Sequence, residues 1–197
     1  MSTAPHRKLT PEQYLEIERK AQFESEFYRG EMFAMPGANR EHCRISANLI
    51  CCIAPRLDSR PYEVVGSDMR VRVSRTRFYT YPDLSILCDN AQFADDRTDT
   101  LLNPKVLFEI LSDATEKSDR GFKFENYRQL DSMEEFVIVS QTEPLVEVYQ
   151  RLPDGDWLLR EARALEESIT LHSIGITLPS SEIYLRVEFP GPDTTVA

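Results

Sequence analysis

The sequence predicts an α/β (α+β) fold in which a mixed central β-sheet is flanked by helices. Three observations lead to this prediction. Helix-start signals stand in the first third of the chain, apolar strand-like runs fill its middle, and alternating runs return toward the C-terminus. Helices before and after a group of strands can cover the faces of one sheet, so a layered domain is expected.

The first expected elements are a short helix and a hairpin. Thr10–Gln13 combines an N-cap threonine, a proline at the first helical position and a glutamine at the third. We expect this helix to run to about Ala21. Ser25–Met35 then reads as a β-hairpin with Arg29-Gly30 as its turn.

A second, longer helix is expected after Asn39, which is a favourable N-cap residue. Pro55 is expected to kink or end this helix, because proline lacks the amide hydrogen of a helix interior. Four apolar residues follow one helical stripe: Ile45, Leu49, Cys52 and Ile53.

The remaining elements are mostly strands, identified by alternating or continuous apolar residues between turn signals. A polar loop is expected at Asp89–Asn103 and a helix at Thr115–Leu130, and Pro153–Gly155 marks a turn between the last two strands. The expected strands are Tyr62–Val65, Asp68–Val73, Thr80–Cys88, Lys105–Leu111, Phe136–Val139, Leu145–Tyr149 and Asp156–Arg160.

The length of 197 residues suits one domain, which we expect to span residues 1–188, with a flexible tail at 189–197. No apolar run approaches the roughly 18–20 residues of a membrane span. The N-terminus lacks the apolar segment of a secretory signal, so we expect a cytoplasmic protein. Four cysteines without a CxxC pair indicate buried, unpaired thiols rather than a zinc site.

The net charge of −10, from 23 basic and 33 acidic residues, argues against a protein that coats nucleic acid nonspecifically. This net charge does not exclude a small, local basic groove. A magnesium ion would also neutralise part of a carboxylate cluster.

Glu109 is the most informative single residue, because it lies inside the apolar run Val106–Leu111. Burying an ionised carboxylate costs several kcal/mol unless cations or hydrogen-bond donors meet it. A buried ion pair and a metal or catalytic site both explain it. Asp83 follows Pro82 in another strand-like run, where a strand-start role is the simpler explanation; if the two strands are neighbours, a divalent cation would relieve the repulsion between the carboxylates.

Lys123 is the third candidate. It shares a helical stripe with Tyr127 and Leu130, so its amine is expected to point toward the carboxylates. The alternative is a surface ion pair with Asp119, worth only about 0.3–0.5 kcal/mol. Two carboxylates and a lysine around a metal are suited to phosphodiester hydrolysis, in which the cation activates water and the lysine stabilises developing negative charge.

Two weaker candidates complete the set. His42 lies in the first turn of the second helix, on the stripe of Ile45, where it can face a cleft or simply be satisfied locally. Glu26 lies in the first hairpin, where most glutamates are solvated.

These motifs, taken together, resemble the Uma-type restriction endonuclease family of the PD-(D/E)XK nuclease superfamily. The resemblance covers roughly residues 10–185. It rests on Glu26, Gly30-Glu31-Met32, His42, Tyr81-Pro82-Asp83, Glu109-Ile110-Leu111-Ser112, Asp119, Lys123, Tyr127 and Glu135-Phe136-Val137.

The resemblance implies a restriction-endonuclease-like core and a Mg²⁺-dependent endodeoxyribonuclease, with Mn²⁺ as an alternative ion. By matched position, Asp83 and Glu109 would be the metal ligands and, with Lys123, the catalytic residues. Leu111 stands where the superfamily usually has lysine, and Lys123 would substitute for it.

Further family positions are matched by Glu26, His42 and Tyr127, which would support the site. DNA is the expected partner, no membrane is expected, and a homodimer is one option because nucleases that cut both strands often act as dimers. A noncatalytic or regulatory binding protein on a nuclease scaffold is the alternative, suggested by the acidic charge and the absent nearby lysine. A glycosidase is disfavoured by the single tryptophan, Trp157.

Overall fold

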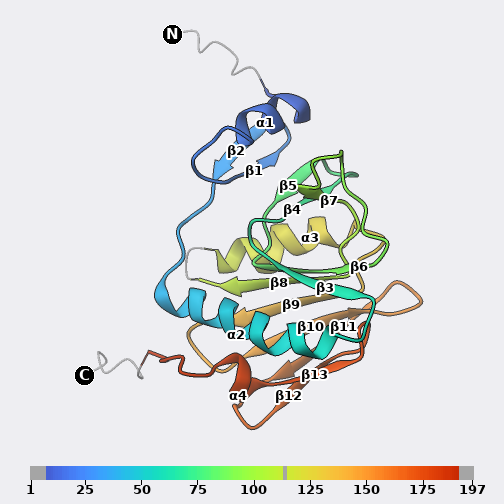
Figure 1. Ribbon diagram of the computed structural model, residues 1–197. Helices are drawn as coiled ribbons and strands as arrows, with labels where there is room; N and C mark the ends of the chain where they lie inside the picture. The colour runs from blue at the N-terminus through green and yellow to red at the C-terminus, as the bar shows by residue number, and fades with distance from the viewer. Residues whose placement is uncertain (1–7, 113–114, 191–197) are drawn as a thin grey trace.

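A six-stranded sheet lies at the centre of the computed structural model (Figure 1), which describes residues 8–112 and 115–190. The strand order is β11-β10-β9-β8-β6-β3, and β8 and β9 are parallel whereas the other neighbours are antiparallel. The expected mixed sheet is therefore confirmed. Its strands are β3 (Tyr62–Gly66), β6 (Leu84–Cys88), β8 (Val106–Leu111), β9 (Glu135–Ser140), β10 (Val146–Arg151) and β11 (Trp157–Ala162).

Two smaller sheets accompany the central one. The five-stranded sheet has the order β2-β1-β5-β4-β7, and β12 pairs with β13 in a separate hairpin. Their bounds are β1 (Ser25–Tyr28), β2 (Glu31–Ala34), β4 (Arg70–Val73), β5 (Phe78–Thr80), β7 (Thr100–Leu101), β12 (Ser168–Leu171) and β13 (Ile176–Pro179).

Helices cover both faces of the central sheet. The helix α2 (Arg40–Leu57) packs Ile45 and Leu49 against one face, in a core that includes Phe108 of β8. On the other face, α3 (Phe124–Tyr127) contributes Tyr127 to a second core. It continues from the π-helix η1 (Ser118–Lys123), and a short helix α4 (Ser180–Ile183) packs beside α2. This layering is the one the sequence predicts.

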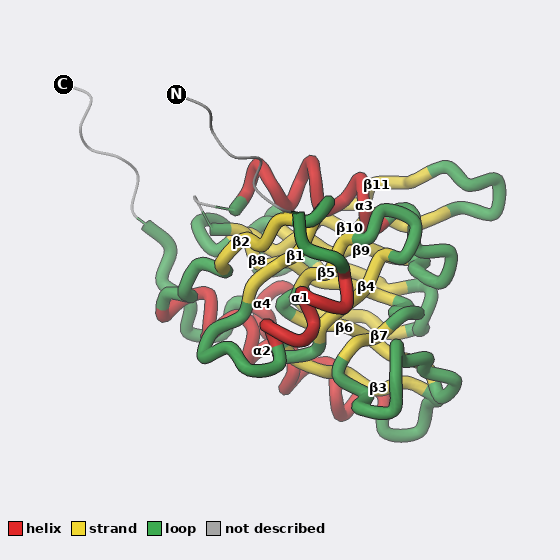
Figure 2. The backbone as a smooth tube through the Cα atoms, turned by 90° about the horizontal axis from the view of Figure 1, so that it is seen from above, coloured by secondary structure: helices red, strands yellow, loops and turns green. Residues whose placement is uncertain are grey.

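The first helix begins where expected but ends at Glu18 rather than at about Ala21, and the first hairpin forms as expected. In α1 (Pro11–Glu18), Thr10 and Gln13 make the reciprocal hydrogen bonds of a capping box. The turn between β1 and β2 has positive φ at both Arg29 (49°) and Gly30 (93°), as a two-residue hairpin turn requires. Tyr14 of α1 stacks on Phe27 of β1, so α1 lies against the five-stranded sheet (Figure 2).

The prediction of one strand over Thr80–Cys88 is wrong. The chain leaves the five-stranded sheet at Thr80 and enters the central sheet at Leu84. Pro82 lies at this break, since proline has no amide hydrogen to continue a sheet ladder. As a result, Asp83 lies at the crossing between the two sheets rather than within a strand.

Other predictions need smaller corrections. Within the helix expected at Thr115–Leu130, residues 118–123 form a π-helix and the regular helix ends at Tyr127. The expected loop at Asp89–Asn103 contains β7. Cys43 and Cys51 are exposed rather than buried, because both lie on the outer side of α2, and all four thiols are free.

The chain ends are not part of the description. Most of the expected tail, residues 191–197, lies outside the described residues, so both the tail and the single domain over 1–188 stay predictions. None of the helices in the described residues is long and apolar enough to cross a bilayer.

Candidate active site

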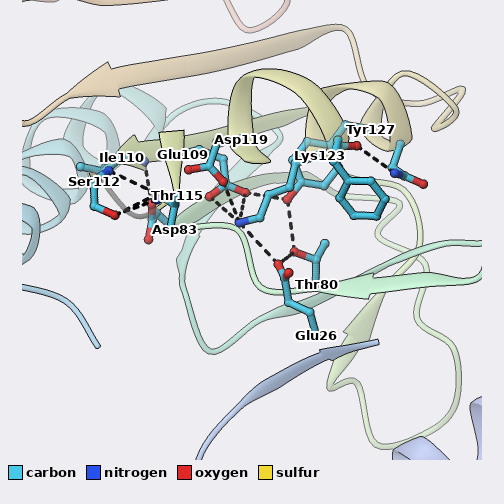
Figure 3. A network of polar contacts seen from close by, with 12 residues as sticks. Glu26, Thr80, Asp83, Glu109, Ile110, Ser112, Thr115, Asp119, Lys123 and Tyr127 are labelled. Carbon is cyan, nitrogen blue, oxygen red and sulfur yellow. Dashed lines mark hydrogen bonds and ion pairs between the residues drawn. The ribbon is translucent and has the colours of Figure 1, made fainter. Parts of the chain in front are cut away.

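A cleft of about 900 Å³ opens where the first turn of α2, the carboxyl ends of β8 and β9, and the crossing between the two sheets meet. Five of the six expected site residues line it: Glu26, His42, Asp83, Glu109 and Lys123. The sixth, Tyr127, contacts the cleft through Glu109 (Figure 3). Residues far apart in the chain are thus gathered as the sequence predicts; their catalytic role stays a prediction.

Glu109 lies at the centre of the cluster, on the buried strand β8, with only 3% of its surface exposed. Lys123 Nζ is 3.1 Å from both Oε1 and Oε2, and the Tyr127 hydroxyl donates to Oε1 at 2.6 Å. Burial raises the pKa of the Glu109 carboxyl well above its usual value; Lys123 opposes this effect, whereas Asp119 and Asp83 add to it.

Lys123 is the last residue of η1 and is 6% exposed. Besides Glu109, its Nζ lies 3.1 Å from Asp119 Oδ1 and 3.4 Å from Glu26 Oε1. Burial lowers the pKa of the lysine, but the surrounding carboxylates, led by Glu109 and Glu26, outweigh burial and raise it. The amine thus lies among three acids that favour its charged form.

Asp83 and His42 form the second part of the site. Asp83 Oδ2 accepts a hydrogen bond from the Ile110 amide at 2.6 Å, which fixes the carboxylate beside the strand that carries Glu109. His42 Nε2 lies 3.2 Å from Asp83 Oδ1. Burial lowers the pKa of His42, yet the hydrogen bond and charge of Asp83, together with Asp119, produce a net increase.

Glu26 is held in the cluster by Thr80, whose hydroxyl donates to Oε1 at 2.6 Å. The Thr80 hydroxyl also lies 3.4 Å from that of Tyr127. Thr80 is fully buried and thereby joins the hairpin glutamate to the tyrosine that contacts Glu109. Nothing in the pattern of the sequence singled out Thr80.

Asp119 is the main residue whose place the sequence left open. The surface ion pair with Lys123 that served as the alternative explanation is excluded, because Asp119 is 1% exposed and pairs with Lys123 inside the cleft. The four-residue spacing and the family motif were the available signals. Burial raises the pKa of Asp119, and Lys123 opposes this.

We call Glu26, Asp83, Glu109, Asp119 and Lys123 the Lys123 cluster. It contains four carboxylates and one lysine, and that lysine is the only Lys or Arg side chain lining the cleft among the described residues. A divalent cation is one way to relieve an excess of negative charge of this kind.

The carboxylate oxygens of the cluster are suitable ligands for such a cation. Carboxylate oxygens suit Mg²⁺ and Mn²⁺, and each retains acceptor capacity beside the hydrogen bonds described above. Within residues 8–112 and 115–190, no three His, Cys, Asp or Glu side chains form a ready-made metal cage. Mg²⁺ does not require one, because it is commonly held by one or two carboxylates with water and substrate phosphate.

Comparison with known proteins identifies relatives of this chain. Residues 11–181 match the model of the Uma2 family, described as "Putative restriction endonuclease". Two uncharacterized proteins of Synechocystis sp. (strain ATCC 27184 / PCC 6803 / Kazusa) are each 33% identical to the chain. The match to slr1290 covers 95% of this chain and 97% of the relative, and the match to sll1609 covers 82% and 91%.

A solved structure shares the fold. The crystal structure of "a putative nuclease belonging to DUF820" from Anabaena variabilis ATCC 29413 matches with a TM-score of 0.72 at 14% identity, over 89% of this chain and 97% of that one. This likeness confirms the restriction-endonuclease-like core. Because the family model matches most of this chain, residues 11–181, the chain belongs to the Uma2 family.

Proposed function

We propose that this protein is a metal-dependent endonuclease that hydrolyses phosphodiester bonds in DNA. The observation that carries the proposal is the contact of Lys123 Nζ with both oxygens of Glu109, at 3.1 Å, in a cleft that Asp83 also lines. The family description agrees with nuclease chemistry. Asp83 and Glu109 are the proposed metal ligands, and Lys123 is the proposed third catalytic residue.

A Mg²⁺ or Mn²⁺ ion at Asp83 and Glu109 would polarise a phosphoryl oxygen and lower the pKa of the attacking water. Lys123 supplies a fixed positive charge for the negative charge that develops on the phosphate oxygens. Its position does not depend on a lysine two places after Glu109, because η1 brings the amine to the same carboxylate from the following helix.

The remaining residues of the cleft act by positioning. Tyr127 donates to Glu109 and restricts its orientation, while His42 and the Ile110 amide fix the two oxygens of Asp83. Glu26 and Asp119 hold the amine of Lys123 in place. The protein would act in the cytoplasm, where its thiols stay reduced, and as a homodimer if it cuts both strands.

The test is cleavage of plasmid and linear duplex DNA by the purified chain, with Mg²⁺, Mn²⁺ or EDTA. We expect cleavage when Mg²⁺ or Mn²⁺ is present and none in EDTA. The rate of cleavage is expected to fall at least about 100-fold in Asp83→Ala and Glu109→Ala. Glu166→Ala, at an exposed residue outside the cleft, is the matched control.

Unchanged cleavage in Glu109→Ala would contradict the assignment. DNA binding without any cleavage in the presence of metal would instead favour a noncatalytic protein on a nuclease scaffold. Circular dichroism of each variant separates loss of chemistry from loss of folding.

A further inference from the structure

A second part of the cleft is lined by side chains without charge, with the carboxylate of Glu24 at its border beside Met35. One wall is the outer stripe of α2, and the other is the segment after β2. The residues of both walls are small or apolar, and we call this part the neutral half. It is lined by Ala34, Met35, Pro36, Gly37, Ala38, Cys43, Ser46, Ala47 and Ile50.

The stripe on α2 is exposed, unlike the apolar stripe that faces the core. Cys43, Ala47 and Ile50 follow one another at helical spacing and are exposed, with Ile50 at 37%. The core-facing residues Ile45 and Leu49 of the same helix are fully buried. The outer stripe therefore presents an uncharged surface to the cleft.

Gln141 lines the same cleft, and its side-chain carbonyl has no hydrogen-bond partner among the described residues. Gln141 directly follows β9 and is 7% exposed. Its Oε1 is buried and accepts no hydrogen bond from any atom of the described residues. Leaving a buried acceptor unpaired costs about 1–3 kcal/mol, so such a group in a native protein calls for an explanation.

The place of Gln141 in the fold points to a ligand. Leu111 of β8 pairs with Ser140 of β9 in a parallel register, so Gln141 follows the carboxyl end of the parallel pair. In open parallel α/β sheets, ligands bind outside the carboxyl ends of the strands, and β8 and β9 are the parallel pair of this mixed sheet. Here the same edge carries Glu109 and leads into the cleft.

We propose that the neutral half binds one nucleobase that has been withdrawn from its stack, and that the Gln141 carboxamide hydrogen-bonds the edge of that base. The inference rests on the proposed nuclease function and names the form of its substrate. Small and apolar walls accept the faces of an uncharged ring, while the amide offers a donor beside an acceptor. Adenine presents the complementary pair, and glutamine is a common partner for it.

The consequence is a preference for DNA that is single-stranded or distorted beside the cut. A base inside an intact duplex cannot reach such a pocket without being extruded, which costs a few kcal/mol and least where the base is already unpaired. The cluster would then act on a phosphate next to the bound nucleotide.

The test separates binding from cleavage. Fluorescence anisotropy in EDTA measures the affinity for short single-stranded oligonucleotides that carry adenine or an abasic residue at one central position. We expect the wild-type chain to bind the adenine form about 10-fold more tightly. Gln141→Met, which keeps the length of the side chain but removes the amide, is expected to abolish this difference.

A measurement of thermal stability tests whether Gln141 has only a structural role. Because Oε1 is unpaired in the free protein, Gln141→Met is expected to melt at the wild-type temperature or above it. Gln141→Leu serves as the second variant if Gln141→Met does not fold. Gln92→Met, at an exposed glutamine away from the cleft, should retain the preference for adenine.

Each other outcome overturns the inference. These outcomes are equal affinity of the wild type for the adenine and abasic forms, no binding of either form, and a preference that survives in Gln141→Met. Metal-dependent cleavage that ignores the abasic residue leaves the nuclease proposal standing and removes the base pocket. Base-selective binding without cleavage does the reverse.

Discussion

Two buried ionic networks lie close together in this protein and differ in their charge. In the first, which we call the Arg70 network, Arg70 Nε donates to the Tyr81 hydroxyl at 2.8 Å, and this hydroxyl donates to Glu18 Oε1 at 2.9 Å. Arg70 also bonds Thr100 at 2.9 Å and lies 3.6 Å from Asp99. The second is the Lys123 cluster.

The Arg70 network is nearly balanced, because Arg19 and Arg70 face three carboxylates, Glu18, Asp95 and Asp99, of which Asp95 is exposed. In the Lys123 cluster three carboxylates contact the one lysine, and the fourth, Asp83, pairs with His42. Buried charges are tolerated when they are paired and hydrogen-bonded. The Arg70 network is therefore explained by structure alone, whereas the excess of carboxylates in the Lys123 cluster is the observation behind the proposed metal site.

The largest expected effect comes from removing the single amine of the unbalanced cluster. Lys123→Met leaves Glu109 and Asp119 as buried carboxylates without their cation, so we expect a loss of about 3–5 kcal/mol in the free energy of unfolding. Urea denaturation at neutral pH measures it. Lys20→Met, which removes an exposed lysine paired with Glu16, should stay within about 0.5 kcal/mol of wild type.

A loss below about 1 kcal/mol in Lys123→Met would show that the carboxylates do not depend on this amine. The two networks would then differ in their charged residues but not in how much those residues contribute to the free energy of unfolding.

An intermediate effect should distinguish the networks through metal binding. Mg²⁺ at 100 times its dissociation constant should stabilise the wild type by about 2.7 kcal/mol, because only the folded chain holds the site. This increment should vanish in Asp83→Asn and Glu109→Gln but persist in Glu18→Gln of the Arg70 network. Melting curves of each variant with and without Mg²⁺ measure it. An equal increment in all four proteins would place the ion elsewhere.

The smallest expected effect is on stability at acid pH and concerns the Arg70 network. The hydrogen bonds from Arg19 lower the pKa of Asp99 from 3.8 to about 2. Because the folded-state pKa is depressed, the stabilisation is present above pH 3.8 and is lost as the pH falls through about 2. In Asp99→Asn, the decline in stability between these values should be about 1 kcal/mol shallower.

Acid denaturation at a series of pH values tests this expectation, with Asp156→Asn at an exposed turn as the control. Parallel profiles for wild type and Asp99→Asn would show that the Arg19 pair does not contribute to acid stability.

Local patterns predicted the elements that local physics controls. The capping box at Thr10, the hairpin turn at Gly30 and the helix after Asn39 all depend on residues a few positions apart. The apolar run Thr80–Cys88 was wrongly predicted as one strand, because the pattern does not reveal that Pro82 divides the run between two sheets. It also left Asp119 undecided, since burial depends on what packs over η1.

The sequence by itself determined the mixed sheet between helices. It marked Glu109 and Asp83, because a carboxylate in a strand-like apolar run is visible without coordinates, and Lys123, because it shares a helical stripe with Tyr127. Only the tertiary structure decided that these residues meet in one cleft, and that Asp119 and Thr80 join them. It alone left the carbonyl of Gln141 unpaired there. The physical reason is that secondary structure follows from neighbours in the chain, whereas burial and pairing depend on contacts between segments that are distant in sequence.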